Sequence, residues 1–181
     1  EFLGQFGASG RGDGQFVWPR SIDLDSEGNV FASDDFLHRI SVFDKDGAFL
    51  SSWGTRGSKE GELDGPSGIA FDGDDNIFVV DSANNRIQKF TKDGSFIGSF
   101  GQEGQGDGEL NLPWGICVGP DGGVYVADWR NNRVQKFDSE GRFQVMFQGT
   151  ETGVGDLHGP TGIAVDSEGD VYVTDWGNHR V

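Results

Sequence analysis

The sequence repeats itself with a period of 47 residues, and this regularity constrains the fold more than any other feature. A proline recurs at that interval, at Pro19, Pro66, Pro113 and Pro160. An Asp at the end of an apolar run recurs at the same interval of 47 residues, and so does an Arg that follows it. The Asp residues are Asp34, Asp81, Asp128 and Asp175, and the Arg residues are Arg39, Arg86, Arg133 and Arg180. No insertion or deletion interrupts the register, so the chain is expected to fold as repeated units that cover one another.

We therefore expect a single domain or fragment over residues 1–181, with full repeats at 19–65, 66–112 and 113–159 and partial repeats at 1–18 and 160–181. Such uniform repeat length favours recent duplication or deliberate design. Because the first and last repeats are partial, three interpretations are open. We favour the first, in which the sequence is a window on a longer protein. In the second, several copies combine, and in the third, residues 1–6 supply an outer strand to the last repeat.

Each repeat carries the signals of four short strands. In the second copy, alternating apolar residues predict strands at 66–72, 77–81, 86–90 and 95–100. The segment Asp93-Gly94 predicts a tight hairpin before the fourth strand, because Gly adopts positive φ without strain. Four antiparallel strands and a longer Gly-rich connection match the blade of a β-propeller, which cannot bury both of its faces alone.

The run Asp-x-x-Asn-x-Arg-[Ile/Val] resembles an NHL repeat. It stands at 81–87, 128–134 and 175–181, whereas the copy at 34–40 has Leu37 in place of Asn. The resemblance implies an all-β β-propeller of four-stranded antiparallel blades, with about four NHL-type repeats forming part of a six-bladed or oligomer-completed ring. For function the resemblance is less specific, because family members include protein and RNA binders, lyases and extracytoplasmic sensor domains.

Composition and charge narrow the partners. The chain has 31 Gly and 15 Phe, which suits many short strands, and its formal net charge of −16 repels polyphosphates. We therefore expect no nucleic acid partner. No apolar stretch is long enough to span a bilayer, so we expect no membrane insertion. The compartment is unknown from the residues, and a location outside the cytoplasm is the favoured expectation. The single cysteine, Cys117, lies between Ile116 and Val118 and is expected to be a buried small side chain.

Substitutions between copies concentrate on one face of the predicted blades. The connection into the first strand and the turn between the second and third strands share an end of each blade, and both vary among copies. Aromatic and Arg side chains there would form a concave surface for a protein, peptide or glycan. The candidate ligand-binding residues are Arg20, Phe36, Trp114, Trp129, Arg130 and Trp176. Packing of the tryptophans against the adjacent blade is the structural alternative.

The recurrent Asp and Arg residues are expected to be structural rather than catalytic, because an active site needs one asymmetric constellation and these groups stand in every copy. Charge-assisted hydrogen bonds between them would hold the turn between the second and third strands. Asn84, Asn131 and Asn178 are expected to be residues of that turn, because Asn tolerates left-handed backbone.

No metal or cofactor is expected. His38 and His179 occupy equivalent positions on different blades, and with His158 they are too few for a lyase-type metal site. The turn at 72–76 offers hard oxygen ligands for weak Ca²⁺ binding, but it lacks EF-hand spacing, so an acidic hairpin facing solvent is the expectation.

These observations predict a non-catalytic binding or scaffold module. One alternative is a fragment of an NHL-type metal-dependent lyase whose missing blades supply the catalytic groups. Another is a designed or amplified repeat protein whose role is folding and self-assembly. Besides a protein, peptide or glycan, the candidate partners are a second copy of this chain or the remaining blades of a longer chain.

Overall fold

The computed structural model describes residues 4–149 and 155–181 and shows three complete blades and half of a fourth. Each complete blade is an antiparallel sheet of four strands in chain order. Blade 1 contains β3 (Pro19–Leu24), β4 (Val30–Asp34), β5 (Arg39–Phe43) and β6 (Phe49–Trp53). Blade 2 contains β7 (Pro66–Phe71), β8 (Asn76–Asp81), β9 (Arg86–Thr91) and β10 (Phe96–Phe100). Blade 3 contains β11 (Ile116–Val118), β12 (Val124–Asp128), β13 (Arg133–Phe137) and β14 (Phe143–Phe147), and blade 4 contains β15 (Pro160–Val165) and β16 (Val171–Asp175).

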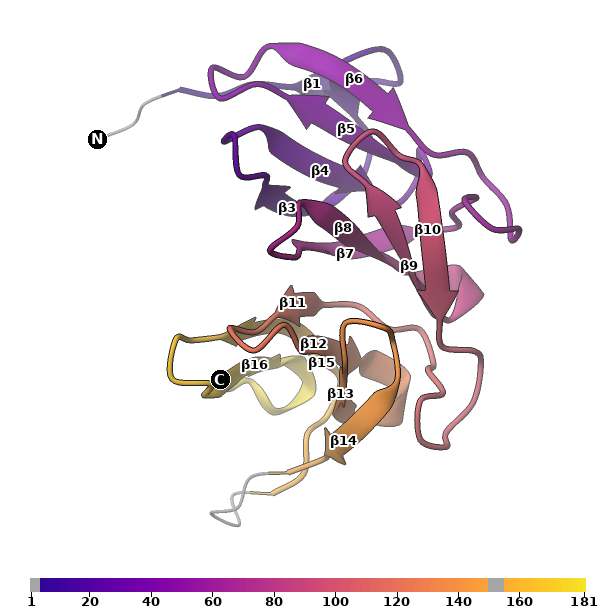
Figure 1. The fold of residues 1–181 in the computed structure, drawn as a ribbon, viewed down its shortest axis with the longest axis vertical. Helices are drawn as coiled ribbons and strands as arrows, with labels where there is room; N and C mark the ends of the chain where they lie inside the picture. Colours follow the sequence, from indigo (N-terminus) through magenta and orange to yellow (C-terminus); the bar gives the residue numbers. More distant parts are fainter. Residues whose placement is uncertain (1–3, 150–154) are drawn as a thin grey trace.

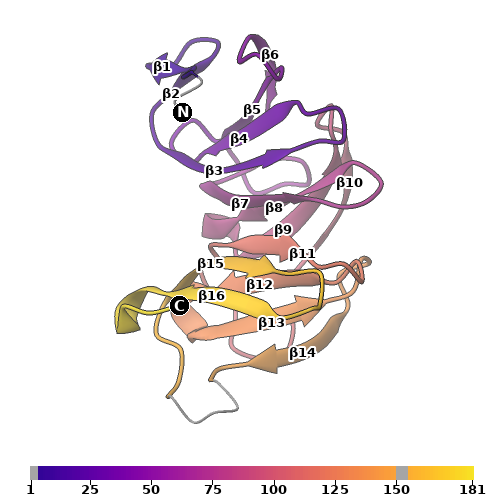
Figure 2. The same ribbon diagram turned by 90° about the vertical axis from the view of Figure 1, so that its left-hand side faces the viewer.

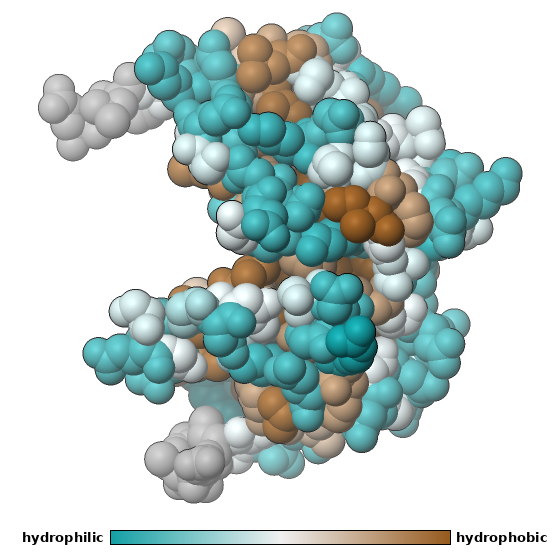
Figure 3. Space-filling model, in the orientation of Figure 1, coloured by the Kyte–Doolittle hydropathy of each residue, from teal (hydrophilic) through white to brown (hydrophobic). Residues whose placement is uncertain are grey.

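The blades stand side by side in an open arc, with the first strand of each blade innermost (Figures 1 and 2). Strand β7 contacts β3 on one side and β11 on the other, and β11 contacts β15. The space-filling view shows the arc hollowed on its concave side (Figure 3). The prediction of an all-β protein built of four-stranded blades is therefore confirmed.

The hydrophobic core lies between blades rather than within them. Where blade 1 meets blade 2, one apolar cluster joins residues of both, among them Phe31 and Ile40 from blade 1 and Ile69 and Phe90 from blade 2. Its edge-to-face contact between Phe31 and Phe71, with ring centroids 4.8 Å apart, crosses the junction.

Blades 2 and 3 meet through a second cluster, and strand alternation divides blade 2 between the two. Ile69 and Val79 face blade 1, whereas their neighbours Ala70 and Val80 face blade 3. Successive residues of a strand point to opposite faces, so every strand of blade 2 contributes to two junctions.

The outer strands add a repeated aromatic contact. The last residue of one blade's outer strand packs on the third-strand Phe of the next blade: Trp53 lies 4.9 Å from Phe90, and Phe100 lies 4.8 Å from Phe137, between ring centroids. Phe6 makes the same contact with Phe43 at 4.8 Å. Phe6 therefore occupies the place that Trp53 and Phe100 hold in the following repeats, although residues 4–7 form no strand. The expectation of an outer strand over residues 1–6 falls partly on residues 1–3, which lie outside the described part of the chain.

The connection into blade 1 contains a short parallel pair of strands, β1 (Ala8–Ser9) and β2 (Gln15–Phe16), which the alternation of apolar residues did not indicate. The turn between the second and third strands forms a 3₁₀ turn in three blades: η1 (Ser82–Asn84), η2 (Trp129–Asn131) and η3 (Trp176–Asn178).

Asn84 and its counterparts lie in this turn, as expected, but they are not its left-handed residues. The residue after each of them has positive φ: Asn85 (54°), Asn132 (53°) and His179 (55°). Asn84 ends the 3₁₀ turn instead, because its side chain is needed to donate hydrogen bonds to Asp81.

The hairpin glycine Gly94 has φ of +87°, and a Cβ on it would lie 2.6 Å from Cγ of Trp53 in the preceding blade. We predict that Gly94→Ala lowers the free energy of unfolding by about 2 kcal/mol or more, since left-handed backbone costs Ala about 1–2 kcal/mol before the steric clash is added. Urea denaturation measures the change. Gly73→Ala is the matched control, because nothing lies within 4 Å of its added Cβ. Equal effects of the two substitutions would contradict the close packing of blades.

Candidate binding face

We call the end of the arc that carries the proline turns and the 3₁₀ turns the loop face. On this face, the residue that follows the recurrent proline lies beside the residue that follows the recurrent Asp. The second of these two residues comes 15 positions after the first in the sequence. In blade 1 the two are an ion pair, Arg20 with Asp35; in blade 2 they are two hydroxyls, Ser67 with Ser82. In blade 3 they are two aromatic rings, Trp114 and Trp129. The prediction that these two loops share one end of the blade is confirmed.

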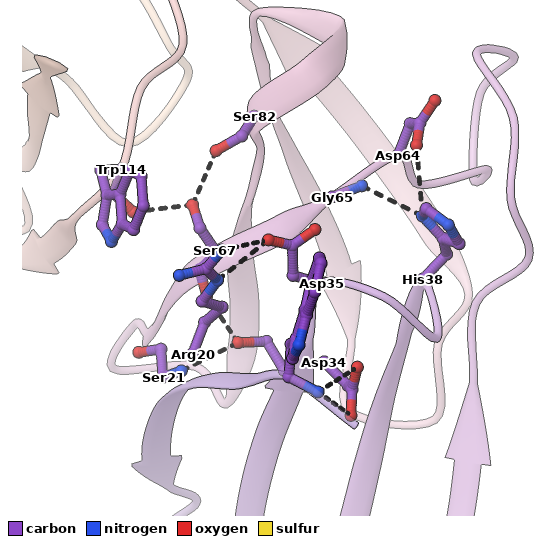
Figure 4. A network of polar contacts seen from close by, with 12 residues as sticks. Arg20, Ser21, Asp34, Asp35, His38, Asp64, Gly65, Ser67, Ser82 and Trp114 are labelled. Atoms are coloured by element: carbon purple, nitrogen blue, oxygen red, sulfur yellow. Dashed lines mark hydrogen bonds and ion pairs between the residues drawn. The ribbon is translucent and has the colours of Figure 1, made fainter. Parts of the chain in front are cut away.

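Arg20 ties the first pair to the third. Its Nε and Nη2 both donate to Oδ2 of Asp35, at 2.9 and 2.6 Å (Figure 4). Its guanidinium carbon lies 4.8 Å from the centroid of the Trp114 ring, a cation–π contact across two blade boundaries. Nη1 of Arg20 has no hydrogen-bond partner among the residues that the structure describes, so it can donate to an added acceptor.

The serine pair forms the floor between these residues. Ser67 Oγ donates to the carbonyl oxygen of Trp114 at 2.8 Å, and Ser82 Oγ donates to that of Pro113. The two Oγ atoms are 2.8 Å apart (Figure 4). The two hydroxyl protons are shared among these three contacts, so at least one is donated to the loop entering blade 3 and links it to blade 2.

The third pair closes one side of a hollow of about 170 Å³. The rings of Trp114 and Trp129 meet edge to face, 5.7 Å apart at an interplanar angle of 63°. A second hollow of about 200 Å³ shares Arg20 and Trp114 and is otherwise lined by residues of the first strands of all four blades and by Gly115. Three of the six predicted ligand-binding residues, Arg20, Trp114 and Trp129, therefore come together.

The remaining predicted residues lie elsewhere on the loop face. Phe36 packs edge to face against Trp18 at 5.3 Å, and Arg11 stacks on Phe36 at 4.9 Å. Arg130 stacks on Trp129 at 5.1 Å but lines a separate depression. Trp176 is exposed beside Thr161 in blade 4. The expected single aromatic surface is thus divided into separate groups.

Sequence reasoning missed the partners of the predicted residues. Asp35, Ser67 and Ser82 line the first hollow, and Trp18 and Arg11 complete the group around Phe36. The signal that would have revealed the pairing is a constant spacing of 15 residues between side chains that can interact, such as Arg20 with Asp35 or Trp114 with Trp129.

The recurrent Asp holds the connection between blades. Asp81 is fully buried and accepts hydrogen bonds from the Asp64 amide (2.6 Å), Asn84 (2.9 Å) and Nε of Arg86 (2.7 Å). Arg86 and Gln88 also donate to the carbonyl oxygen of Glu62. Burial raises the pKa of the Asp81 carboxyl, and the hydrogen bonds from Asp64, Asn84 and Arg86 act in the opposite direction. This cluster of Asp, Asn, Arg and Gln, which we call the clamp, fixes segment 57–64 to the blade.

The clamp recurs in full around Asp128, and its Asp, Asn and Arg recur around Asp175. Asp128 pairs with Arg133 at 2.8 Å, and Asp175 pairs with Arg180 at 2.6 Å. Hydrogen bonds from Asn178, His158 and Arg180 outweigh burial and lower the pKa of Asp175. In these copies the expected hydrogen bonds between Asp and Arg are present.

In the first copy, which departs from the motif, Asp34 and Arg39 do not pair in the described part of the chain. Arg39 donates to the carbonyl oxygens of Gly12 and Gln15, while its buried Nε has no partner in the described chain. Asp34 accepts backbone amides, including that of Leu37. The cause lies in two substitutions: Leu37 replaces the donor Asn, and Ser41 replaces the Gln.

The opposite end of the blades carries the acidic turns. Asp72 accepts the backbone amides of Asp74 and Asn76 and pairs with Lys89 at 2.9 Å. Burial raises the pKa of Asp72, but the bonds from Lys89 and Asn76 outweigh it, so the pKa lies below its ordinary value. Its oxygens are thus occupied within the turn. Over residues 4–149 and 155–181, no group of three or more His, Cys, Asp or Glu is placed to hold a metal ion.

Cys117 lies half-buried on β11, on the side that faces blade 4. Burial raises the pKa of its thiol to about 12. The thiol is therefore protonated at neutral pH and acts as a small apolar side chain.

Three segments of the chain, residues 63–90, 110–137 and 157–181, match the model of the NHL repeat. Each segment begins in the connection that precedes a blade. It then includes the first two strands of that blade and the turn that carries the recurrent Asp, Asn and Arg. The chain contains three NHL repeats. RING finger protein nhl-1 of Caenorhabditis elegans is 50% identical over 44 residues, which is 24% of this chain and 4% of that protein.

Solved structures share the fold of this NHL-repeat chain. A catalytically inactive virginiamycin B lyase from Staphylococcus aureus, solved with quinupristin, superposes with a TM-score of 0.68 at 21% identity over 88% of this chain and 50% of the lyase. A hydrazine synthase from Kuenenia stuttgartiensis gives 0.64 at 18% identity, covering 90% and 47%. The chain thus spans about half the length of these structures. Among the described residues, no helix is long and apolar enough to cross a membrane.

The clamp leads to a direct test. We predict that Asn84→Leu lowers the free energy of unfolding by about 2 kcal/mol, because Asp81 and the carbonyl oxygen of Gly57 both lose a donor. Chemical denaturation followed by Trp fluorescence measures the change.

The equivalent position of the first copy provides the control, because it allows the reverse substitution of Leu by Asn. Leu37→Asn restores the donor at the equivalent position and is expected to leave stability unchanged or raise it. If Asn84→Leu costs no more than ordinary surface substitutions, about 0.5 kcal/mol, the clamp does not hold the connection.

Proposed function

We propose that the chain is a non-catalytic recognition module that binds an extended peptide segment of a partner protein across the loop face. The matched pairs carry this proposal. At two positions that contact each other in every complete blade, one copy presents an ion pair, one a hydroxyl pair and one an aromatic pair, whereas the clamp keeps the same residues in blades 2 and 3. A surface that varies on a fixed scaffold is where repeat proteins place recognition.

The size of the two hollows favours side chains as their occupants. Pockets for whole small molecules measure about 300–1,000 Å³, and the hollows beside Arg20 and Trp114 are about 170 and 200 Å³. Two adjacent hollows separated by the Arg20–Trp114 contact suit two side chains of one extended segment.

The orientation of the rings favours a peptide over a glycan. A sugar stacks on an open aromatic face, but Arg20 covers one face of Trp114 and Arg130 covers one face of Trp129. The two rings therefore line the hollow as an apolar wall. The free Nη1 of Arg20 supplies a donor for a peptide carbonyl, which a backbone lying over the hollow would present.

The lyase alternative draws only on the solved relatives. Their likeness, at 21% identity or below, is a likeness of fold, and the activity in their names belongs to them. The peptide proposal rests on side chains of this chain and so is preferred.

We test the proposal by selecting binders from a library of random linear peptides and measuring the affinity of synthesised hits by fluorescence anisotropy. Loss of a buried aromatic anchor typically costs 2 kcal/mol or more, so Trp114→Ala with Trp129→Ala is expected to weaken binding by about 30-fold or more.

Trp176→Ala is the matched control, since Trp176 lies on the same face outside both hollows; it is expected to change affinity less than about two-fold. A glycan array is screened in parallel. Peptide binding that is indifferent to Trp114 and Trp129, or binding of glycans without binding of peptides, would contradict the proposal.

A further inference from the structure

One hydrogen bond recurs at the junctions between blades. The left-handed residue that ends the turn between the second and third strands uses its side chain to accept the backbone amide of a residue that enters the next blade. The acceptor and donor pairs are His38 with Gly65 at 3.1 Å, Asn85 with Leu112 at 2.7 Å and Asn132 with Gly159 at 2.8 Å. The junction of blades 1 and 2 thus uses an imidazole where the other two junctions use a carboxamide. Of these two groups, only the imidazole can gain a proton between pH 5 and 8.

The Nδ1 atom of His38 faces two groups with opposite requirements. The Gly65 amide donates to Nδ1, which requires a lone pair on that nitrogen. Oδ1 of Asp64 lies 3.2 Å from the same nitrogen, and a carboxylate requires a proton there (Figure 4). One nitrogen cannot satisfy both groups at once. The neutral ring with its proton on Nε2 therefore holds Gly65, and the protonated ring holds Asp64.

The connection before blade 2 supplies the charged groups nearest to the imidazole. Oδ1 of Asp64 also lies 3.4 Å from Nε of Arg56, but the Arg56 side chain is 71% exposed, so water and salt screen its charge. A proton on His38 therefore converts the contact with Asp64 into a charge-assisted hydrogen bond from a more enclosed donor.

The other elements around His38 offer it no free carboxylate. Its own turn and the residue that follows contain three charged side chains, each of which has another partner; they are Asp34, Asp35 and Arg39. The 3₁₀ turn η1 of blade 2 approaches Gly65 through Ala83 and contains no charged residue. Asp64 is therefore the carboxylate that a protonated His38 engages.

Gly65 links this contact to the candidate binding face, because it lines the first hollow. The residue before it is held independently: the Asp64 amide donates to Asp81 at 2.6 Å, and the Asp64 carbonyl oxygen accepts the Ala83 amide at 3.1 Å. Release of the Gly65 amide would therefore loosen one wall of the hollow while the connection stays attached to blade 2.

We propose that His38 makes the first hollow sensitive to pH. Near neutral pH the ring accepts the Gly65 amide, and the hollow keeps its shape. In mildly acidic solution Nδ1 takes a proton from solvent, donates it in a hydrogen bond to Asp64 and releases Gly65, so that peptide binding weakens. The effect on binding rests on the proposed function, whereas the exchange of partners at Nδ1 does not.

NMR spectroscopy of the isotope-labelled chain between pH 8 and 5.5 tests the exchange of partners without any ligand. As the His38 ring gains its proton, the Gly65 amide proton is expected to move upfield. After correction for the intrinsic effect of pH, it is expected to exchange with solvent about 3- to 10-fold faster, which is the loss of one hydrogen bond. The amides of Leu112 and Gly159 are the internal controls and should keep their protection. A Gly65 amide that stays protected while His38 is protonated would overturn the proposal.

The substitution His38→Asn supplies the acceptor that the other two junctions use. It is expected to keep the Gly65 amide protected at both ends of the pH range. His158→Asn is the matched control, because His158 is exposed and lies in the loop entering blade 4; this variant should respond to pH like the unchanged chain. Circular dichroism checks that both variants fold. A pH response of Gly65 that persists in the His38→Asn chain would contradict the assignment to His38.

Peptide affinity tests the consequence for the hollow. A selected linear peptide without His, Asp or Glu, labelled with rhodamine, is expected to bind the unchanged chain about 3- to 10-fold more weakly at pH 5.5 than at pH 7.5. The His38→Asn chain is expected to bind it equally at both pH values. Equal weakening in both chains would overturn the coupling of His38 to the hollow. Absence of any peptide binder would contradict the proposed function alone, because the NMR titration needs no peptide.

Discussion

The structure depends on the burial of each blade's two apolar faces by its neighbours. Blade 2 places Ile69, Ile77, Val79 and Phe90 against blade 1, and Phe78, Val80 and Ile87 against blade 3. Full burial of such side chains contributes about 1.5–3 kcal/mol each, so these seven supply on the order of 10–20 kcal/mol. Since a typical domain is stable by only about 5–15 kcal/mol in total, a blade deprived of both neighbours has no net stability. The 47-residue period is the sequence counterpart of this dependence.

Polar contacts specify how the blades are joined. The clamp around Asp81 and Asp128 fixes each connection to its blade, and the left-handed Asn85 and Asn132 fix the loop into the next blade. These contacts use the backbone of the connection and the side chains of the recurrent motif. The two positions that pair on the loop face take no part in the clamp, so they are free to become an ion pair, a hydroxyl pair or an aromatic pair without loss of the scaffold.

The sequence predicted most of the fold because the period and the strand alternation both follow from local spacing. The four strands of blade 2 begin and end within one residue of the predicted positions. The site was predicted less completely. Periodicity showed that Arg20, Trp114 and Trp129 share a face, but the hollow they form depends on how far each blade turns relative to the next, which no spacing within a repeat reveals. The left-handed backbone of Asn85 rather than Asn84, and the donation of Arg39 to Gly12 and Gln15 rather than to Asp34, likewise depend on which acceptors the neighbouring connection supplies.

The most direct test of this account is the folding of one excised repeat, residues 66–112, compared with the whole chain by circular dichroism and amide NMR. The account predicts that the isolated repeat shows no cooperative melting and poorly dispersed amide signals, because both of its apolar faces are exposed to water. A repeat that folds alone, with a sharp thermal transition and dispersed signals, would show that blade stability is internal and would contradict the account.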